Sequence, residues 1–396
     1  MAIGLAFLAG LSLLLTLWQW FAAFRFPLHK RVSDHSFTPG ITLLKPLKGL
    51  DSNTIQCLQS WLQQDYEGPV QVLFGVASEE DPICAPVREL LRQHPDRNAS
   101  LIVCDESMGP NAKVSTLIQL SREAQHEFIV VSDADVFVPA DFLLNVVAPM
   151  RDANVGLVNC FYRLANPTTL AMRWEALAIN SDFWSQVLQG RMLAPLDYAL
   201  GAVMATRRET LKASGGFEAL ADYLADDFQL GNRVVNRAGK QIALCPVVVD
   251  CREAPMNWKQ AWKHQLRWAR TIRVCKPVPY AASIVSNATL WPLLWVLLAP
   301  SSTALIALAV CLLARVAMAQ TLQRRLGHVA GQGWYWWLAP VKDLLQLGLM
   351  FGAFNGRRVQ WRGVHFHLHS DGRLISLRQV GVGSVNAGLE LGAGET

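Results

Sequence analysis

The chain has 396 residues, of which 52% are hydrophobic and only 17% charged. Soluble domains carry about 25% charged residues, so this deficit, with a mean hydropathy of +0.21, indicates a protein with membrane segments. The net charge of +5 is modest and no basic stripe with interleaved aromatics occurs, which tells against a nucleic-acid-binding protein.

The first predicted element is a membrane anchor within residues 1–25. Residues 3–24 carry no charge and are long enough to cross a hydrocarbon core of about 30 Å. Arg25, Lys30 and Arg31 follow, and the positive-inside bias places the next domain in the cytoplasm. A cleaved signal peptide is the rival interpretation, but it lacks a positive segment before the apolar run.

Residues 38–278 predict a soluble α/β domain. Strand-like runs such as GITLLKPLK, VQVLFGVAS, SLIVCD and EFIVVSDADV alternate with helix-like segments at 53–64, 86–94 and 113–124. Short continuous apolar runs are typical of strands buried on both faces of a mostly parallel sheet. The alternation predicts a doubly wound sheet, in which ligands bind beyond the carboxyl ends of the strands.

The eight cysteines give neither a C-x-x-C pair nor a zinc-ligand spacing. Scattered cysteines in a chain of this size are typical of reduced, buried thiols in the cytosol. We therefore expect no disulfide framework.

Two acidic motifs follow in the predicted domain. Asp133 and Asp135 lie two residues apart where a buried strand ends, and paired carboxylates there suit Mg²⁺ bridging a diphosphate. A polar strand end or helix cap is the alternative. Asp226 and Asp227 open a predicted helix, where acids are favoured in any case, but a carboxylate there is also a candidate general base.

Three further segments are candidates for binding a nucleotide ligand. Asp81 follows a strand and either caps the next helix or accepts a hydrogen bond from a nucleobase. Lys113 opens a helix and is either a solvated first-turn lysine or a contact to a phosphate or sugar. The run from His264 to Arg270 is either a set of membrane-flanking cations or, with its tryptophans, a place where a guanidinium meets a leaving diphosphate.

Residues 279–356 predict further membrane helices. The apolar block 281–318 is interrupted by Pro300, which predicts a helical hairpin. A third block, 334–354, contains Lys342 and Asp343, which are costly within a membrane. Either these two side chains pair, or the helix lies along the interface. Residues 357–396 predict a strand-like segment and a glycine-rich flexible tail after Gly381.

Several motifs in order resemble the ceramide glucosyltransferase family, glycosyltransferase family 21, and equally the bacterial hopanoid-associated glycosyltransferases. They are KPLKG, the EDP around Asp81, GPNAKVSTL, SDAD, GGFEALADYLADDFQLG, HQLRWART and VQWRGVHFHL, and they extend over about residues 40–370. The family pattern of three aspartates and a Q/R-x-x-R-W motif falls on Asp81, Asp133, Asp227, Arg267 and Trp268. His264 departs from it, because it stands where the pattern has Gln or Arg.

The resemblance implies a GT-A-type fold and an inverting hexosyltransferase. Asp227, Arg267 and Trp268 would be catalytic, and Asp133 and Asp135 would hold Mg²⁺ or Mn²⁺. The residues implied to bind the UDP-sugar are Asp81, Lys113, Asp133, His264 and Gln265. The donor is expected to be UDP-glucose and the acceptor ceramide, in an integral protein of a bacterial inner membrane with a cytoplasmic catalytic domain.

Three alternatives remain open at this point. A hopanoid receiving N-acetylglucosamine would need the same chemistry. A processive polysaccharide synthase needs a channel built from more membrane spans than the sequence suggests. A membrane scaffold without catalysis would not depend on Asp227.

Overall fold

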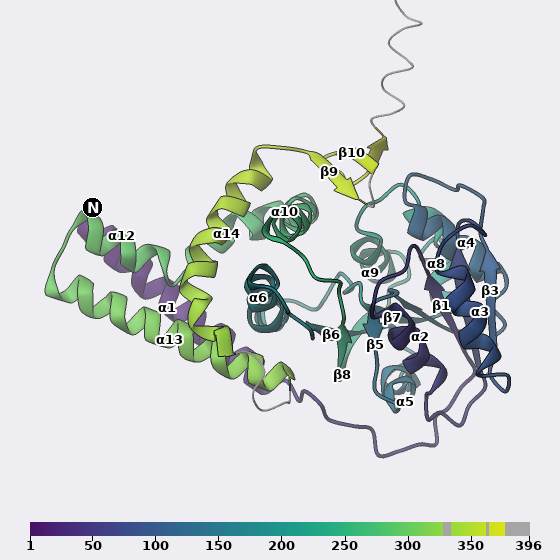
Figure 1. Ribbon diagram of the computed structural model, residues 1–396. Helices are drawn as coiled ribbons and strands as arrows, with labels where there is room; N and C mark the ends of the chain where they lie inside the picture. Colours follow the sequence, from purple (N-terminus) through teal and green to yellow (C-terminus); the bar gives the residue numbers. More distant parts are fainter. Residues whose placement is uncertain (328–333, 362–363, 377–396) are drawn as a thin grey trace, which may run out of the picture.

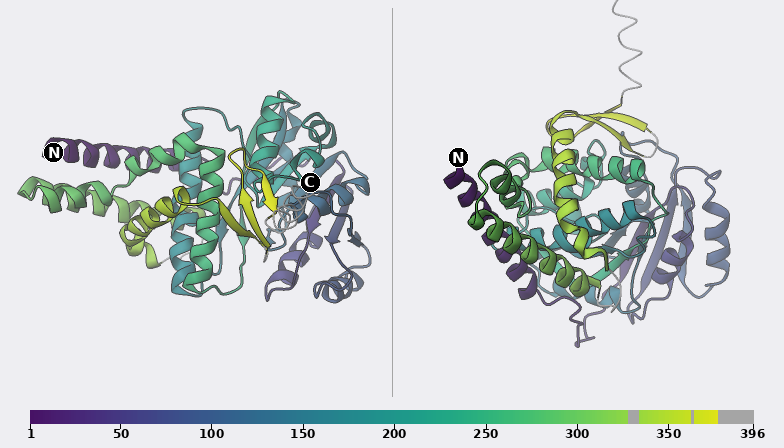
Figure 2. Two further views of the ribbon diagram at one scale, coloured as in Figure 1. Left: turned by 90° about the horizontal axis from the view of Figure 1, so that it is seen from above. Right: turned by 60° about the vertical axis from the view of Figure 1, so that its left-hand side comes forward.

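The computed structural model describes residues 1–327, 334–361 and 364–376; the tail predicted after Gly381 lies outside them. Figure 1 shows an α/β body from which helices α1, α12 and α13 project as an arm, and the left view of Figure 2 shows the same arm from above. The body is built on one eight-stranded sheet. Its strands are β1 (Ile41–Pro46), β2 (Val70–Val76), β3 (Asn98–Val103), β4 (Phe128–Ser132), β5 (Val136–Phe137), β6 (Val155–Leu164), β7 (Val203–Arg207) and β8 (Gln241–Cys251).

The sheet has the order β3-β2-β1-β4-β7-β6-β8-β5. The first four strands are parallel neighbours, with Ile41 opposite Val70 on one side and Phe128 on the other. Strand β7 is antiparallel to β4 and β6, β8 is parallel to β6, and β5 is antiparallel to β8. The predicted α/β doubly wound sheet with mainly parallel pairing is therefore confirmed.

Helices cover both faces of this sheet because its central strands are apolar on both sides. Along β4, Val130 faces one core cluster, whereas Ile129 and Val131 face the other. The first core is closed by α2 (Thr54–Leu62), α3 (Cys84–Arg92) and α5 (Phe142–Val147). The second is closed by α4 (Ala112–Arg122), α8 (Arg208–Ala213) and α9 (Asp226–Asn236). The parallel strands β1, β2 and β4 thus send their following loops to one edge of the body.

Two long helical segments lie between the sheet and the arm. The first comprises α6 (Leu170–Leu177), a π-helical turn η2 (Ala178–Phe183) and α7 (Trp184–Arg191). The second, α10 (Trp258–Cys275), begins with a capping box formed by Asn257 and Gln260. Helix α10 packs against α6 and against α14 (Ala339–Phe354), and a small antiparallel sheet follows. Its strands are β9 (Arg358–Trp361), β10 (Val364–Leu368) and β11 (Leu374–Ser376).

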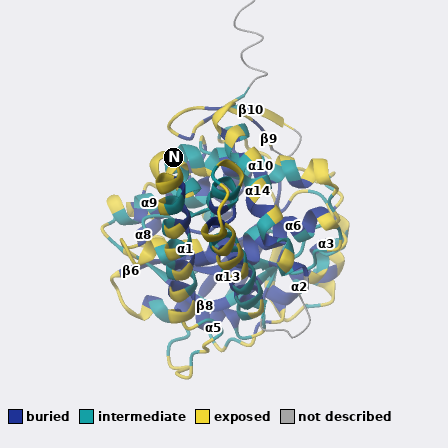
Figure 3. Ribbon diagram, turned by 90° about the vertical axis from the view of Figure 1, so that its left-hand side faces the viewer, coloured by how far each residue is buried: buried dark blue, intermediate teal, exposed yellow. Residues whose placement is uncertain are grey.

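Two helices in the described part of the chain are long and apolar enough to cross a membrane: α1 (Ala2–Arg25) and α13 (Ser302–Gly327). Segment 277–286 and α12 (Leu290–Leu298) meet at a bend of 54°, so together they form a broken span or a re-entrant loop. Figure 3 shows exposed residues along α1 and α13, and these include Phe7, Leu14, Ile306 and Leu313. The break expected at Pro300 falls between α12 and α13.

The sequence left open how Lys342 and Asp343 are accommodated, and the structure answers that they pair inside the protein. Both side chains are buried, and Lys342 Nζ lies 3.1 Å from Asp343 Oδ1. Arg315 of α13 contacts Asp343, and Asp182 of η2 contacts both Arg315 and Lys342. Two acids and two bases therefore balance in one buried cluster, which we call the charge clamp.

All eight cysteines are free thiols, six of them buried. The expected burial is observed for these six, and the reduced state of the thiols stays a prediction.

Candidate active site

The loops after β1 and β2 are joined through Asp81. Its Oδ1 and Oδ2 each accept a hydrogen bond from Gly49 N at 3.0 Å, and Oδ1 also accepts one from Ile83 N at 3.1 Å. Among the described residues, this carboxylate bonds to loop amides and to none of the other predicted site residues. Asp81 therefore shapes the rim of the sheet edge, and its contact with a nucleobase stays a prediction.

Asp133 and Asp135 lie in the turn between β4 and β5, as the sequence suggested. The side chain of Asp133 is 39% exposed, and its Oδ1 lies 2.8 Å from Lys113 Nζ. Burial raises the pKa of Asp135 to about 6, and the charge of Asp133 adds to this effect. A divalent cation would favour the charged form of both carboxyl groups, including Asp135, whose ionisation is otherwise opposed. The two neighbouring oxygen donors therefore fit such a cation.

Lys113 links the two acidic motifs. Its helix, α4, is capped by Asn111, whose side chain accepts from Val114 N and donates to the carbonyl of Tyr223. From this start Lys113 reaches Asp133 and also Asp226, at 3.2 Å, with a side chain only 8% exposed. Burial opposes its charge, but the acids hold the pKa of Lys113 well above its usual range. Its predicted contact with the donor stays a prediction.

Asp227 opens α9 beside this ion pair, as expected. Its Oδ1 accepts a hydrogen bond from Phe228 N at 2.7 Å. Burial raises the pKa of Asp227 to about 6, and the charge of Asp226 adds to the rise. A Cβ at Gly201 would lie 2.7 Å from Oδ2 of Asp227, so a larger residue there would require the carboxyl group to shift. Asp227 is thus a half-buried carboxylate whose pKa suits a base near neutral pH.

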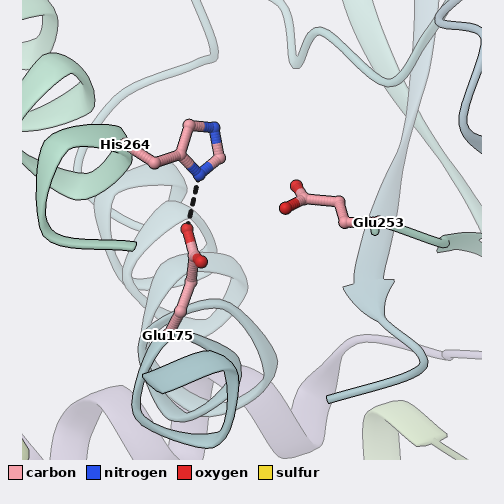
Figure 4. A group of neighbouring side chains, drawn as sticks. All are labelled: Glu175, Glu253 and His264. Atoms are coloured by element: carbon pink, nitrogen blue, oxygen red, sulfur yellow. Dashed lines mark hydrogen bonds and ion pairs between the residues drawn. The ribbon is translucent and has the colours of Figure 1, made fainter. Parts of the chain in front are cut away.

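The HQLRW segment lies on α10, and its first two residues face α6. His264 Nδ1 lies 2.6 Å from Glu175 Oε1, and Gln265 Nε2 donates to the same oxygen at 2.8 Å. Figure 4 shows Glu175 and His264 in contact, with the carboxyl group of Glu253 directed towards both. The predicted donor contacts of His264 and Gln265 stay predictions; the observed contacts anchor α10 to α6.

Trp268 and Arg267 connect α10 to the acidic centre. The Trp268 ring packs edge-on against Tyr162 of β6, with centroids 6.4 Å apart. Burial raises the pKa of Tyr162 well above its usual range, and the charges of Asp227 and Asp133 contribute. The charge of Asp135 raises the pKa of the Glu253 carboxyl group, and the charge of Arg267 lowers it. The two acidic motifs and the RW pair therefore occupy one neighbourhood.

The interpretation of the sequence missed three residues of this neighbourhood. Lys45 is fully buried at the end of β1, donates to the Asp133 carbonyl at 2.7 Å and lies over the Trp61 ring. Burial lowers the pKa of Lys45 to about 8. Its place at the end of a buried strand was a usable signal. The sequence carries little signal for Glu175 and Glu253, because neither belongs to a recognisable motif of paired acids.

The overall fold matches a solved structure. The chain aligns with the mannosyltransferase PcManGT from Pyrobaculum calidifontis, solved in complex with GDP-Man and Mn²⁺, with a TM-score of 0.52 and 21% identity. The alignment covers 88% of this chain and 97% of the solved one. At this identity the likeness shows the fold alone, which is of the GT-A type.

The family follows from the sequence comparison: residues 4–374 match the family model for glycosyl transferase family 21, and the chain belongs to that family. It is 27% identical over 222 residues to ceramide glucosyltransferase 1 of Caenorhabditis elegans, covering 54% of this chain and 46% of that protein. It is 24% identical over 248 residues to an N-acetylglucosaminyltransferase of Bradyrhizobium diazoefficiens, covering 59% and 49%. The chain thus spans about half the length of these relatives. The resemblance noted from the motifs is confirmed at the level of the family.

Proposed function

We propose that this glycosyltransferase transfers a sugar, in the first place glucose, from a UDP-sugar to the hydroxyl group of ceramide, with inversion at the anomeric carbon. The observation that carries the proposal is the convergence of three features: the Asp133–Asp135 pair, the raised pKa of Asp227 and a helix, α10, that packs on the apolar helix α14. The ceramide glucosyltransferases among its relatives support this choice of acceptor.

The chemistry assigned to the residues is a direct displacement. The acceptor oxygen bonds to the anomeric carbon as the bond to the diphosphate oxygen breaks, and the acceptor proton passes to Asp227. Mg²⁺ or Mn²⁺ held by Asp133 and Asp135 would neutralise charge on the diphosphate. Arg267 would stabilise the leaving UDP, and Trp268 would fix the acceptor end of the site. Lys45 and Lys113 hold the Asp133 turn in place.

The membrane segments favour a lipid acceptor. Helix α10 shares a packed cluster with α6 and α14 through Ala261, Trp174 and Leu349. Helix α14 in turn packs on α13, which is long enough to cross a bilayer. The RW pair thus lies on a helix connected to the membrane arm. We therefore propose an integral membrane protein, in a bacterial inner membrane, and the basic residues Arg25, Lys30 and Arg31 at and after the end of α1 favour a cytoplasmic catalytic domain.

The mass of the lipid product tests the proposal. Membranes from a bacterial host lacking the enzyme, with and without the full chain, are incubated with ceramide and UDP-glucose, and the lipids are analysed by mass spectrometry. We expect ceramide carrying one hexose. A parallel arm with a hopanoid and UDP-N-acetylglucosamine tests the second candidate, which the Bradyrhizobium relative supports. A hopanoid product, a long polymer, or no product in either arm would refute the ceramide assignment.

Removal of divalent metal is expected to abolish transfer. The Asp135 carboxyl group, with its pKa near 6, and Asp133 would face the diphosphate without a neutralising cation. The measurement is turnover of labelled UDP-sugar in excess EDTA and after Mg²⁺ or Mn²⁺ is restored. Unchanged turnover in EDTA would contradict a metal role for the acid pair.

A further inference from the structure

A second group of metal-ligating side chains lies beside the acid pair, on different elements. Glu175 comes from α6, Glu253 from the segment that follows β8, and His264 from α10. One potential ligand atom of each residue lies within 4.8 Å of those of the other two. Figure 4 shows the imidazole ring and the two carboxyl groups directed towards a common space. Three separate elements thus present nitrogen and oxygen donors to one point.

Glu175 contributes a buried carboxylate oxygen whose hydrogen bonding is incomplete. Its side chain is fully buried, and Oε1 accepts both hydrogen bonds, from His264 and Gln265. Oε2 is buried and has no hydrogen-bond partner among the described residues. Leaving a buried carboxylate oxygen without a hydrogen-bond partner is energetically costly. The unpaired oxygen belongs to a carboxyl group that points into the cluster, so a cationic ligand there would satisfy it.

We propose that Glu175, Glu253 and His264 form a second metal site, which binds a first-row transition-metal ion such as Zn²⁺ or Mn²⁺. An imidazole nitrogen with two carboxylate oxygens suits these ions, whereas Mg²⁺ and Ca²⁺ take oxygen ligands. The ion would tie α10 to α6 and to the end of β8. It would therefore position Arg267 and Trp268 three and four residues further along α10 without touching the substrate.

The nitrogen ligand separates this site from the acid pair, which offers only carboxylate oxygens. The full chain in detergent is stripped of metal and titrated with Mn²⁺ alone, and pulsed EPR records nitrogen hyperfine coupling to the bound ion. We expect about two Mn²⁺ per chain, one of them coupled to nitrogen. Asp135→Asn should remove the uncoupled ion and keep the coupled one. The outcome does not depend on transfer activity, so failure here is distinguishable from failure of the proposed function.

His264→Gln is the decisive variant, because glutamine can still donate to Glu175 and occurs at this place in the family pattern. It should abolish the nitrogen coupling and leave about one Mn²⁺ per chain. His367→Gln, on the half-buried β10 histidine outside the cluster, is the matched control and should behave as the unmodified chain. No nitrogen coupling in the unmodified chain, or coupling that survives His264→Gln, would overturn the proposal.

Glu253→Gln provides a test if His264→Gln does not fold. It removes one charged ligand from a partly exposed position and should weaken the nitrogen-coupled site at least about tenfold, the loss that even outer partners of metal ligands produce. An unchanged affinity would overturn the assignment of Glu253 as a ligand. Circular dichroism of each variant establishes that the chain is folded before metal is added.

Discussion

Replacing Asp227 by asparagine is expected to lower transfer by about 10²–10⁴-fold, the usual contribution of a general base. Asparagine keeps the shape of the side chain and the hydrogen bond from Phe228 N, but it cannot accept a proton. The loss should fall on kcat more than on KM, because proton transfer occurs in the transition state. The measurement is steady-state transfer to the lipid acceptor in detergent.

The pH dependence of kcat/KM tests the role of Asp227 as a base independently. With a pKa of about 6, Asp227 is mostly ionised at pH 7 and becomes protonated as the pH falls through 6. Because only the ionised form accepts a proton, kcat/KM should fall about tenfold per unit below that pH. A cation bound at Asp133 would shift the inflection to lower pH. The residual activity of Asp227→Asn should not show this fall of kcat/KM at low pH.

Asp222→Asn is the matched control, because Asp222 is an exposed acid five residues before Asp227. It should retain full activity, since its backbone carbonyl accepts from Leu374 N and its side-chain charge acts on the exposed Arg373, away from the acidic motifs. Retention of more than about a tenth of the activity in Asp227→Asn would contradict its role as a general base.

The strands and acidic motifs were predictable because their signals are local. The apolar run at residues 128–131 predicts a buried strand, and β4 is buried along its whole length up to Ser132. Asp226 and Asp227 were placed at a helix start by the apolar spacing of Leu230 and Val234, which the core confirms. In each case the pattern that fixes the element lies within about ten residues of the functional side chain.

The partners of these residues were not predictable, because they come from distant parts of the chain. Glu175 contacts His264 across 89 positions, and nothing near either residue indicates the other. The arrangement of β5 to β8 was also not predictable from the sequence, because antiparallel β7 lies in the sheet between β4 and β6. Register between strands so far apart depends on the whole packed sheet, not on local propensity.

The charge clamp is the clearest case of this kind. From the sequence, Lys342 and Asp343 were compatible with pairing or with an interfacial helix, since their partners lie on other helices. Arg315 donates to both oxygens of Asp343, at 2.8 and 2.9 Å, and to Asp182 at 2.8 Å. Asp182 lies in the π-helical turn η2, an element that no simple periodicity predicts.

Arg315→Met is accordingly expected to destabilise the protein by about 3–5 kcal/mol. It would leave Asp182 and Asp343 buried with Lys342 as their only remaining base in the clamp, and an uncompensated buried charge has this cost. The free energy of unfolding is measured by denaturant titration of the detergent-solubilised chain. Arg324→Met, on an exposed arginine of the same helix, is the control and should change it by less than about 0.5 kcal/mol.

The double variant Arg315→Met, Asp343→Leu separates charge imbalance from simple loss of contacts. It removes one base and one acid, so that Lys342 and Asp182 remain as a balanced pair, and it should recover most of the lost stability. If the double variant is less stable than Arg315→Met alone, the clamp acts through its hydrogen bonds and not through charge balance. Because α6, which carries Glu175, continues directly into η2, loosening the clamp should also loosen the support of α10. Recovery of stability should therefore bring recovery of transfer activity with it.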